Sequence, residues 1–283
     1  MITAQTQLYG LIGHPVRQSL SPAMYNALFT KFGIDAVYLA FDVRPSEADR
    51  VADMVRVMGL VGVNLTVPFK ELVMTDLDEC TTAASEAGAV NVVTQIEGVL
   101  MGYNTDGEGF VRSLEEENGP DPKGIHAVIL GAGGAARAIG VECALAGAAH
   151  ITVVNRSADR GNELVTLLND KTPVTAVLES WDGDYTVPAG TDVVINATSI
   201  GLADAEAKLA LDLDSLTAEM VVADVIPNPP RTQLVRDAEA KGCTVIDGLG
   251  MLVNQGITGI EYWTGETVDG NVMRARLEEL FED

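Results

Sequence analysis

Lys70 and Asp106 are the two residues whose types best suit proton transfer. Lys70 is one of only six lysines and follows a run of β-type residues that ends at Pro68, so we expect it at the mouth of a strand. Asp106 stands where the chain leaves its first part. Removing hydrogen from a secondary alcohol requires a base for the hydroxyl proton, and a lysine oriented by a carboxylate could serve. Two alternatives stay open: Lys70 is a solvated side chain, and Asp106 only caps the helix that follows.

A glycine-rich turn in the middle of the chain could hold a dinucleotide. Four apolar residues at 127–130 predict a buried strand, and an alanine-rich run to Ala148 predicts a helix. Between them, Gly131, Gly133 and Ala136 fill the three places of the G-x-G-x-x-G/A pattern. Such a turn lets the backbone approach a pyrophosphate at a helix N-terminus. The alternative is a glycine–alanine turn that only packs the helix on the strand.

The end of the next predicted strand, at 151–154, bears on the choice of cofactor. NAD-binding folds place a carboxylate about 20 residues after the first glycine. Here Asn155, Arg156, Ser157 and Arg160 supply hydrogen-bond donors and positive charge instead. A guanidinium matches the geometry of a phosphate, so this segment favours NADP over NAD. The alternative is that both arginines form solvated ion pairs with Asp159 and with Glu163.

Uncharged polar residues also interrupt several apolar strand ends in the first part of the chain. Such groups are costly to bury unless they are paired, either with a polyhydroxylated ligand or with backbone turns. They are Asn64, Thr66, Asn91 and Asn104. Ser19 and Ser21 stand at a predicted helix start, with Ser21 as the N-cap before Pro22, and could hold a carboxylate. Gln255 is either a ligand contact or an exposed helix position.

The order of elements predicts an α/β protein with two domains. The first part mixes predicted strands with helices, including one expected from Ser46 and Asp49 onward and one from about Glu108 to Glu117. The second part alternates strand and helix, as in a parallel doubly wound sheet. We expect residues 1–106 with the returning helices of 250–283 as one domain and 107–249 as a Rossmann-type domain, with the active site in a cleft between them. The glycine- and proline-rich stretch at 119–124 is the best candidate for a linker.

The composition narrows the possible partners and the setting. With 283 residues and a formal net charge of −23, the chain lacks the cationic surface that nucleic acids and anionic membranes require. It contains no apolar run of about 20 residues and no basic, apolar leader. The three cysteines form no C-x-x-C pair, and Cys143 lies in an apolar run typical of a core. We therefore expect a cytoplasmic protein without a metal site, either a monomer or a homodimer.

Taken together, the motifs resemble the shikimate dehydrogenase family, including its quinate/shikimate branch. The resemblance covers nearly the whole chain in the family's order, and the joint occurrence is more specific than any single block. The matching blocks are Ser19-Leu20-Ser21-Pro22, Asn64-Leu65-Thr66-Val67-Pro68-Phe69-Lys70, Ala89-Val90-Asn91, Asn104-Thr105-Asp106-Gly107, Gly131–Ala136, Asn155–Arg160, Asn196–Gly201 and Asp247–Gln255.

The resemblance implies an enzyme of aromatic amino-acid biosynthesis. It would transfer hydride reversibly between the C3 hydroxyl of shikimate and NADP, with Lys70 and Asp106 as the catalytic pair. The implied substrate-binding residues are Ser19, Ser21, Asn64, Thr66, Lys70, Asn91, Asp106, Gly248 and Gln255. The implied cofactor-binding residues are Gly131, Ala132, Gly133, Gly134, Ala135, Asn155, Arg156, Ser157, Arg160, Thr198, Val225, Gly248 and Met251.

Two positions depart from the family pattern. Gln18 stands where a histidine usually precedes the first serine, and Pro227 stands where a substrate-contacting tyrosine is expected. Proline offers no side-chain donor, so a hydrogen bond near the substrate carboxylate is lost. The alternatives are therefore a quinate/shikimate dehydrogenase with relaxed substrate choice or an NADP-binding regulatory paralogue without activity.

Overall fold

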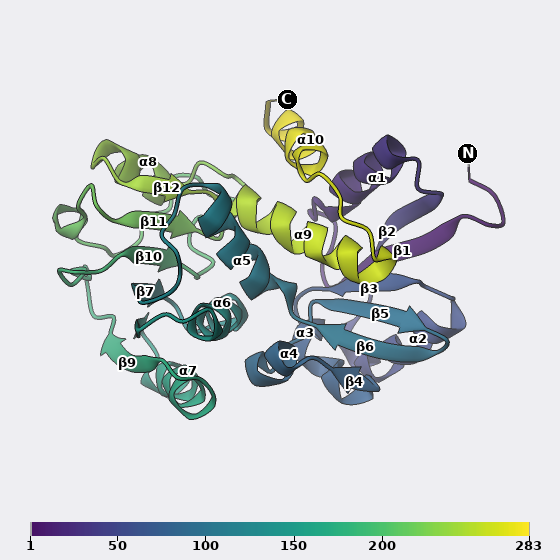
Figure 1. The fold of residues 1–283 in the computed structure, drawn as a ribbon, viewed down its shortest axis with the longest axis horizontal. Coiled ribbons are helices and arrows are strands. Elements are labelled where there is room, and N and C mark those ends of the chain that lie inside the picture. Colours follow the sequence, from purple (N-terminus) through teal and green to yellow (C-terminus); the bar gives the residue numbers. More distant parts are fainter. Residues whose placement is uncertain (1, 283) are drawn as a thin grey trace. The chain divides into compact units, whose positions relative to one another are not determined.

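The computed structural model describes residues 2–282, which form two six-stranded sheets and the helices around them (Figure 1). The strands are β1 (Gln7–Gly13), β2 (Ala36–Asp42), β3 (Gly62–Leu65), β4 (Glu79–Cys80), β5 (Val92–Ile96), β6 (Val99–Tyr103), β7 (His126–Leu130), β8 (His150–Asn155), β9 (Thr175–Ser180), β10 (Val193–Asn196), β11 (Val221–Asp224) and β12 (Thr244–Ile246). The α-helices are α1 (Ser21–Phe32), α2 (Val51–Val57), α3 (Phe69–Leu72), α4 (Thr82–Ala87), α5 (Thr105–Glu116), α6 (Gly134–Leu145), α7 (Ala158–Lys171), α8 (Gln233–Ala240), α9 (Gly248–Thr264) and α10 (Asn271–Glu282). Short 3₁₀ helices are η1 (Pro45–Arg50), η2 (Met74–Asp76) and η3 (Leu213–Ser215).

The chain divides into two compact units, each built on one sheet. The first unit is the described part of Met1–Thr105 with Gly256–Asp283, and the second is Asp106–Gln255. The C-terminal half of α9 and the whole of α10 therefore belong to the unit that the N-terminal residues begin. None of the helices in the described part of the chain is long and apolar enough to span a bilayer.

The first sheet has the order β2-β1-β3-β5-β6-β4 and separates two packed layers. Ile12, Val63 and Val93 point to a face covered by Val51 and Val55 of α2. Because side chains alternate across a strand, their neighbours point to the opposite face. There Tyr9, Tyr25, Tyr38, Phe29 and Trp263 form an aromatic cluster with ring centroids 4.4–6.4 Å apart.

The second sheet is entirely parallel, with the order β12-β11-β10-β7-β8-β9. Its central strands β10 and β11 are buried along their whole length, and β7 is buried from Ala127 onward, because helices cover both faces. Ala127, Ile129 and Ile195 pack with α5, α6 and α7, whereas Val128 and Val194 pack with α8. This is the doubly wound Rossmann-type arrangement, so the predicted α/β fold class is confirmed.

Four local expectations need correction. α1 begins at Ser21 itself, and its N-cap is Leu20 without a side-chain bond. The helix expected from Ser46 is a 3₁₀ segment up to Arg50 with no buried residue, and the α-helix starts at Val51, where apolar burial begins. α5 starts at Thr105 and so contains Asp106. The stretch 119–124 joins α5 to β7 inside the second unit, so it is not a linker between units.

Candidate active site

The parallel strands of the first sheet end at a common edge, where several predicted site residues gather. Gly13 pairs with Asp42, and Ile12 pairs with Leu65, so β1, β2 and β3 stop together. The Thr66 N–H donates to the Ile12 carbonyl at 2.9 Å. A Cβ on Gly13 would lie 2.2 Å from Thr66 Cγ2, so only glycine allows this approach. Thr66 therefore lies against the start of the loop that carries the two predicted serines.

That loop places Ser19 and Ser21 at the start of α1, but with different roles from those expected. The Ser21 N–H donates to Ser19 Oγ at 3.3 Å, so Ser19 is the acceptor at this helix end. Ser21 is buried, and its hydroxyl interacts with the Tyr38 phenol. The prediction that Ser21 is the N-cap is therefore wrong, because the N-cap is Leu20 and the Ser21 hydroxyl interacts with Tyr38 instead. That either hydroxyl holds a carboxylate stays a prediction.

Lys70 lies on the short helix α3, one residue after its start at Phe69, and is half-buried. The expectation that it stands at the mouth of a strand is therefore wrong in detail, because residues 66–69 separate it from β3. Its carbonyl accepts a hydrogen bond from the Val90 N–H at 2.8 Å. α3 is thus fastened to the segment 89–91, which carries Asn91, another predicted site residue.

Asn91 and Asn104 fix the start of α5. Asn91 Nδ2 donates to Thr105 Oγ1 at 3.0 Å, and Asn91 Oδ1 accepts from the Thr105 N–H at 2.7 Å. Asn104 Nδ2 donates to the Ala89 carbonyl at 3.0 Å. All three side chains are buried. Since Thr105 is followed directly by Asp106, these bonds determine where the helix that carries the predicted catalytic carboxylate begins.

Asn64 is also buried, and both ends of its amide have partners within the first unit. Its Oδ1 accepts from the Tyr38 hydroxyl at 2.7 Å, and its Nδ2 donates to the Asn91 carbonyl at 3.2 Å. Burial raises the pKa of Tyr38 well above its ordinary value, so the phenol stays protonated and able to donate. These bonds give Asn64 a structural role that fits one of the two alternatives left open by the sequence.

In the second unit, the first turn of α5 packs closely against α9. A Cβ on Gly109 would lie 2.5 Å from the Gln255 backbone nitrogen, so glycine allows the two helices to touch. Gly109 lies one helical turn after Asp106, and Gln255 is therefore close to that turn. Gln255 is only 7% exposed, and its Nε2 donates to the Leu252 carbonyl at 2.8 Å. The alternative of an exposed helix position for Gln255 is excluded.

The carboxyl edge of the second sheet carries the glycine-rich turn at its centre. Gly131 has φ +111°, which favours glycine, and a Cβ there would lie 3.0 Å from the Ala197 carbonyl oxygen. In the strand order, β8 and β9 lie on one side of β7, and β10, β11 and β12 lie on the other side, so the direction of strand addition reverses at β7. Ligands of doubly wound sheets bind at such a reversal of strand order. The turn therefore lies where a dinucleotide is expected.

The N-terminus of α6 fits a pyrophosphate group. A Cβ on Gly133 or on Gly134 would meet no atom within 4 Å, so the backbone faces open space there. The first turn of this 12-residue helix contains no acidic residue. Its free N–H groups and the positive end of the helix dipole favour an anion. Ala132 and Ala135 complete the predicted turn with short side chains.

The segment after β8 leaves two arginines exposed. Asn155 Nδ2 donates to the Ser157 carbonyl at 2.9 Å, and Ser157 Oγ accepts from the Arg160 N–H at 3.5 Å as the N-cap of α7. Arg156 and Arg160 are both exposed, and within residues 2–282 neither guanidinium forms an ion pair. The alternative that they pair with Asp159 and with Glu163 is therefore not seen. Their charges face solvent, as a binding site for a 2′-phosphate requires.

The other predicted cofactor residues follow β10, β11 and β12. Val225 comes directly after β11, and Thr198 comes two residues after the end of β10. The Val225 N–H donates to the Asn196 carbonyl at 3.1 Å. A Cβ on Gly248 would lie 2.3 Å from the Ile226 carbonyl, so glycine permits close packing of α9 there. Met251 is half-exposed and packs against the sheet core.

Sequence reasoning assigned no role to four polar residues near these loops, although Asn196 begins one of the matching blocks. Asn196, Asp224 and Thr232 form a buried hydrogen-bonded group, and Arg236 fastens two loops to each other. A signal for the first two was present: each is a polar residue that ends a strand of three apolar residues. No local pattern marks the link that Arg236 makes between the loops, because Ala205 and Glu206 lie about 30 residues earlier.

Comparisons with known proteins match nearly the whole chain. Residues 11–93 match the family model for the shikimate dehydrogenase substrate binding domain, and residues 248–278 match that for the shikimate 5′-dehydrogenase C-terminal domain. The chain is 44% identical to shikimate dehydrogenase (NADP(+)) of Methanopyrus kandleri, over 99% of this chain and 98% of the relative.

Two solved structures share the whole fold. 5-Ketofructose reductase of Gluconobacter sp. strain CHM43 has a TM-score of 0.95 and 48% identity, and the match covers 99% of this chain and 100% of that one. A shikimate dehydrogenase in complex with NADP+ has a TM-score of 0.93 and 38% identity, over 99% and 97% of the two chains.

Proposed function

Because this chain belongs to the shikimate dehydrogenase family, we propose that it is an NADP-dependent oxidoreductase that interconverts shikimate and 3-dehydroshikimate. One observation carries the proposal. The Val90 N–H binds the Lys70 carbonyl, and the Leu65 N–H binds the Asn91 carbonyl at 2.9 Å. These two bonds hold the motifs at 64–70 and 89–91 together at one sheet edge, as a common substrate requires.

In the oxidation of shikimate, side chains of this protein transfer the proton of the C3 hydroxyl. We assign Lys70 as the group that takes the proton of the C3 hydroxyl, and Asp106 as the carboxylate that orients the amine and that hydroxyl. Proton transfer by a positioned side chain contributes about 10²–10⁴-fold to a rate. NADP, when bound, supplies the acceptor for the hydride from C3. Thr66, Asn91 and Gln255 would hold the ring hydroxyls, with Ser19 and Ser21 on the carboxylate.

The cofactor site fits NADP for three reasons. The α6 N-terminus is open and free of acidic residues, which suits the pyrophosphate. The strand end at Asn155 lacks the carboxylate that binds a free ribose 2′-hydroxyl. The exposed guanidinium groups of Arg156 and Arg160 suit a 2′-phosphate. Thr198, Val225, Gly248 and Met251 would line the nicotinamide end.

A second candidate function is the reduction of a neutral ketose. The observation that favours it is the 48% identity, over 99% of this chain, to 5-ketofructose reductase. The sequence adds to it, because Pro227 removes a donor near the expected carboxylate. The hydride chemistry would be unchanged, and only the groups that recognise the substrate would differ.

Steady-state turnover of the full chain distinguishes these functions. Shikimate and quinate are each tested with NADP and with NAD, and 5-ketofructose is tested with NADPH. We expect the highest kcat/KM for shikimate with NADP. Reduction of 5-ketofructose without turnover of shikimate would establish the second candidate. Binding of NADP without turnover of any of these compounds would instead indicate a regulatory paralogue.

The setting and the assembly of the chain remain predictions. All three cysteines are free, as in a reducing compartment, and we propose that the enzyme is cytoplasmic. Whether it is a monomer or a homodimer is measured directly by light scattering of the purified chain.

A further inference from the structure

Two loops of the second unit follow neighbouring strands, and buried groups join them at their base. Asp224, at the end of β11, accepts hydrogen bonds from Thr232 Oγ1 at 2.6 Å, Asn196 Nδ2 at 2.9 Å and the Ile226 N–H at 3.1 Å. Asp224, Asn196 and Thr232 are each at most 2% exposed. Burial raises the pKa of Asp224, while its three donors favour the ionised form. The strand ends of β10 and β11 are thus fixed to the start of α8.

The base of each loop carries a predicted cofactor residue. Asn196 Oδ1 accepts from Thr198 Oγ1 at 2.7 Å and from the Thr198 N–H at 3.1 Å. Val225 follows Asp224 directly in the chain. The same three buried side chains therefore determine the positions of Thr198 and Val225.

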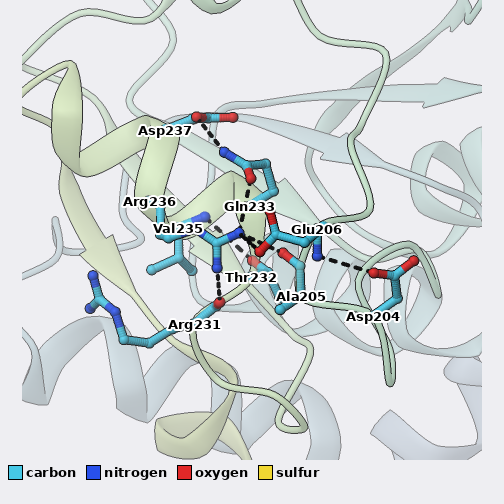
Figure 2. A network of polar contacts seen from close by, with 9 residues as sticks. All are labelled: Asp204, Ala205, Glu206, Arg231, Thr232, Gln233, Val235, Arg236 and Asp237. Atoms are coloured by element: carbon cyan, nitrogen blue, oxygen red, sulfur yellow. Dashed lines mark hydrogen bonds and ion pairs between the residues drawn. The ribbon is translucent and has the colours of Figure 1, made fainter.

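Arg236 joins the loops at a second point, farther from the sheet. In Figure 2 its guanidinium lies among residues of the loop 204–206 and of the segment 231–233. Its Nη2 donates to the Ala205 carbonyl at 2.8 Å, to Glu206 Oε1 at 2.7 Å and to Gln233 Oε1 at 2.9 Å. Its Nη1 donates to the Arg231 carbonyl at 2.7 Å. One side chain on α8 thus binds four acceptors in two segments.

Much of the loop after β10 faces solvent, and besides the bonds of Arg236 only short-range turn bonds and the bond from the Ala203 N–H to the Asn228 carbonyl at 2.9 Å are described for residues 202–207. Leu202, Ala203, Asp204 and Glu206 are exposed, and Lys208 beyond them is exposed as well. Exposed loops without buried apolar contacts open at low free-energy cost. Arg236 supplies fixed hydrogen bonds in the middle of this exposed stretch.

The strand order indicates which half of the cofactor these loops would serve. β8, which is followed by Arg156 and Arg160, lies on one side of β7, and β10 and β11 lie on the other. A dinucleotide centred on the glycine turn would therefore place its 2′-phosphate beside β8. Its nicotinamide half would lie beside the loops that follow β10 and β11.

We propose that Arg236 is a positioning residue for the nicotinamide half of NADP, acting by fastening the loop 199–207 to the start of α8. This inference rests on the proposed NADP-linked function. A displacement of about 1 Å at a reacting group can cost a large factor in rate, so a loosened loop lowers both affinity and kcat. The adenosine half of the cofactor keeps its contacts.

The test compares Arg236→Gln and Arg236→Lys with Arg231→Gln. Arg231 is the matched control because its guanidinium pairs with Glu239 of α8, away from the loop 199–207, and its carbonyl, which Arg236 binds, is unchanged by the substitution. Calorimetry gives the Kd of NADP and of adenosine 2′,5′-bisphosphate, which lacks the nicotinamide half. Trypsin cleavage after Lys208, followed by mass spectrometry without any ligand, reports the loop itself.

For Arg236→Gln we expect about tenfold weaker NADP binding, about tenfold lower kcat and about tenfold faster cleavage after Lys208. The Kd of adenosine 2′,5′-bisphosphate should stay within about twofold of wild type. Arg236→Lys should give intermediate values, since an ammonium can keep part of the bonds.

Three results would overturn the proposal: cleavage no faster than in Arg231→Gln, unchanged NADP binding, or equal weakening for both ligands. Failure of the proposed function is a separate outcome, because it would appear as wild-type protein that binds NADP but does not turn over shikimate.

Discussion

The carboxyl edges of the two sheets use polar residues in different ways. At the edge of the first sheet, Asn64 is bound to Tyr38, and Asn91 is bound to Thr105. At the edge of the second sheet, the glycine turn and Arg156 face open space or solvent. A polar residue at a strand end can therefore either shape a site or bind its ligand. Only the contacts of the folded chain distinguish the two roles.

The largest effect is expected for Lys70, the proposed proton acceptor at the first edge. Lys70→Met keeps much of the side-chain length but removes the amine, so kcat for shikimate should fall about 10³-fold. Lys31→Met is the control, because Lys31 is exposed on α1 in the same unit. Stopped-flow measurement of NADPH formation checks the result. Normal kcat in a Lys70→Met enzyme that binds shikimate would refute the assigned base.

Arg156 tests the edge of the second sheet, where the predicted site residues face solvent. Arg156→Ala should raise the KM for NADP about 10- to 100-fold and leave the KM for NAD nearly unchanged, because NAD lacks the 2′-phosphate. Arg50→Ala controls for the change in net charge, since Arg50 is an exposed residue of the first unit. Steady-state kinetics with both cofactors measure the effect. If both KM values rise together, Arg156 does not recognise the phosphate.

Asn64 tests the edge of the first sheet, where the polar side chains bind one another. Asn64→Ala should lower the free energy of unfolding by about 2 kcal/mol, because it leaves the buried Tyr38 hydroxyl without its acceptor. The KM for shikimate should change by less than about threefold, if the amide serves the fold. Adding Tyr38→Phe should recover part of the stability. Urea unfolding and kinetics give both values, and an unchanged stability with a large rise in KM would make Asn64 a ligand contact.

The smallest expected effect is a change in thermal stability caused by Glu142 on α6. Within residues 2–282 no hydrogen-bond donor lowers its pKa, whereas three donors favour the ionised form of Asp224. Burial first, and then the charge of Glu108, raise the pKa of Glu142 above its ordinary value of 4.5. The folded state thus favours the protonated form, and this stability is lost as the pH rises through the raised pKa. Glu142→Gln mimics that form, so its Tm should exceed that of wild type by about 1–3 °C at pH 7 and match it below pH 4.5.

Thermal unfolding measured from pH 4 to pH 8 shows whether the Tm of Glu142→Gln exceeds that of wild type only at the higher pH values. Glu163→Gln on the exposed side of α7 provides the control. A gain that is the same at all pH values would mean that ionisation of Glu142 is not its cause.

Local sequence signals account for much of the fold. Gly33 ends α1 with φ +67°, and Glu97-Gly98 turns the hairpin of β5 and β6 with positive φ at both residues, as turn chemistry predicts. The parallel second sheet followed from its alternating strands and helices. These features depend on neighbouring residues, which a sequence shows directly.

Features that depend on distant partners escaped prediction. The start of α5 was placed three residues late, because side-chain bonds from Asn91 extend the helix to Thr105. The sequence predicts Ser21 as the N-cap of α1, but in the structure its hydroxyl interacts with Tyr38. The clamp of Arg236 joins residues about 30 positions apart. The predicted site residues were selected by motif, and their division into structural and ligand-facing groups needed these long-range contacts.

The packing of Trp263 sets the order in which the chain can complete its two units during synthesis. Its Nε1 donates to the Val93 carbonyl at 3.0 Å, and its ring packs in tilted contact with the rings of Tyr9 and Tyr25. A Cβ on Gly62 would lie 2.2 Å from that ring, so the glycine in β3 leaves the space that the indole occupies. The ribosome releases residues 106–255 before this tryptophan. The unit that begins the chain is therefore the last to close its core, and a nascent chain must keep its aromatic face protected until then.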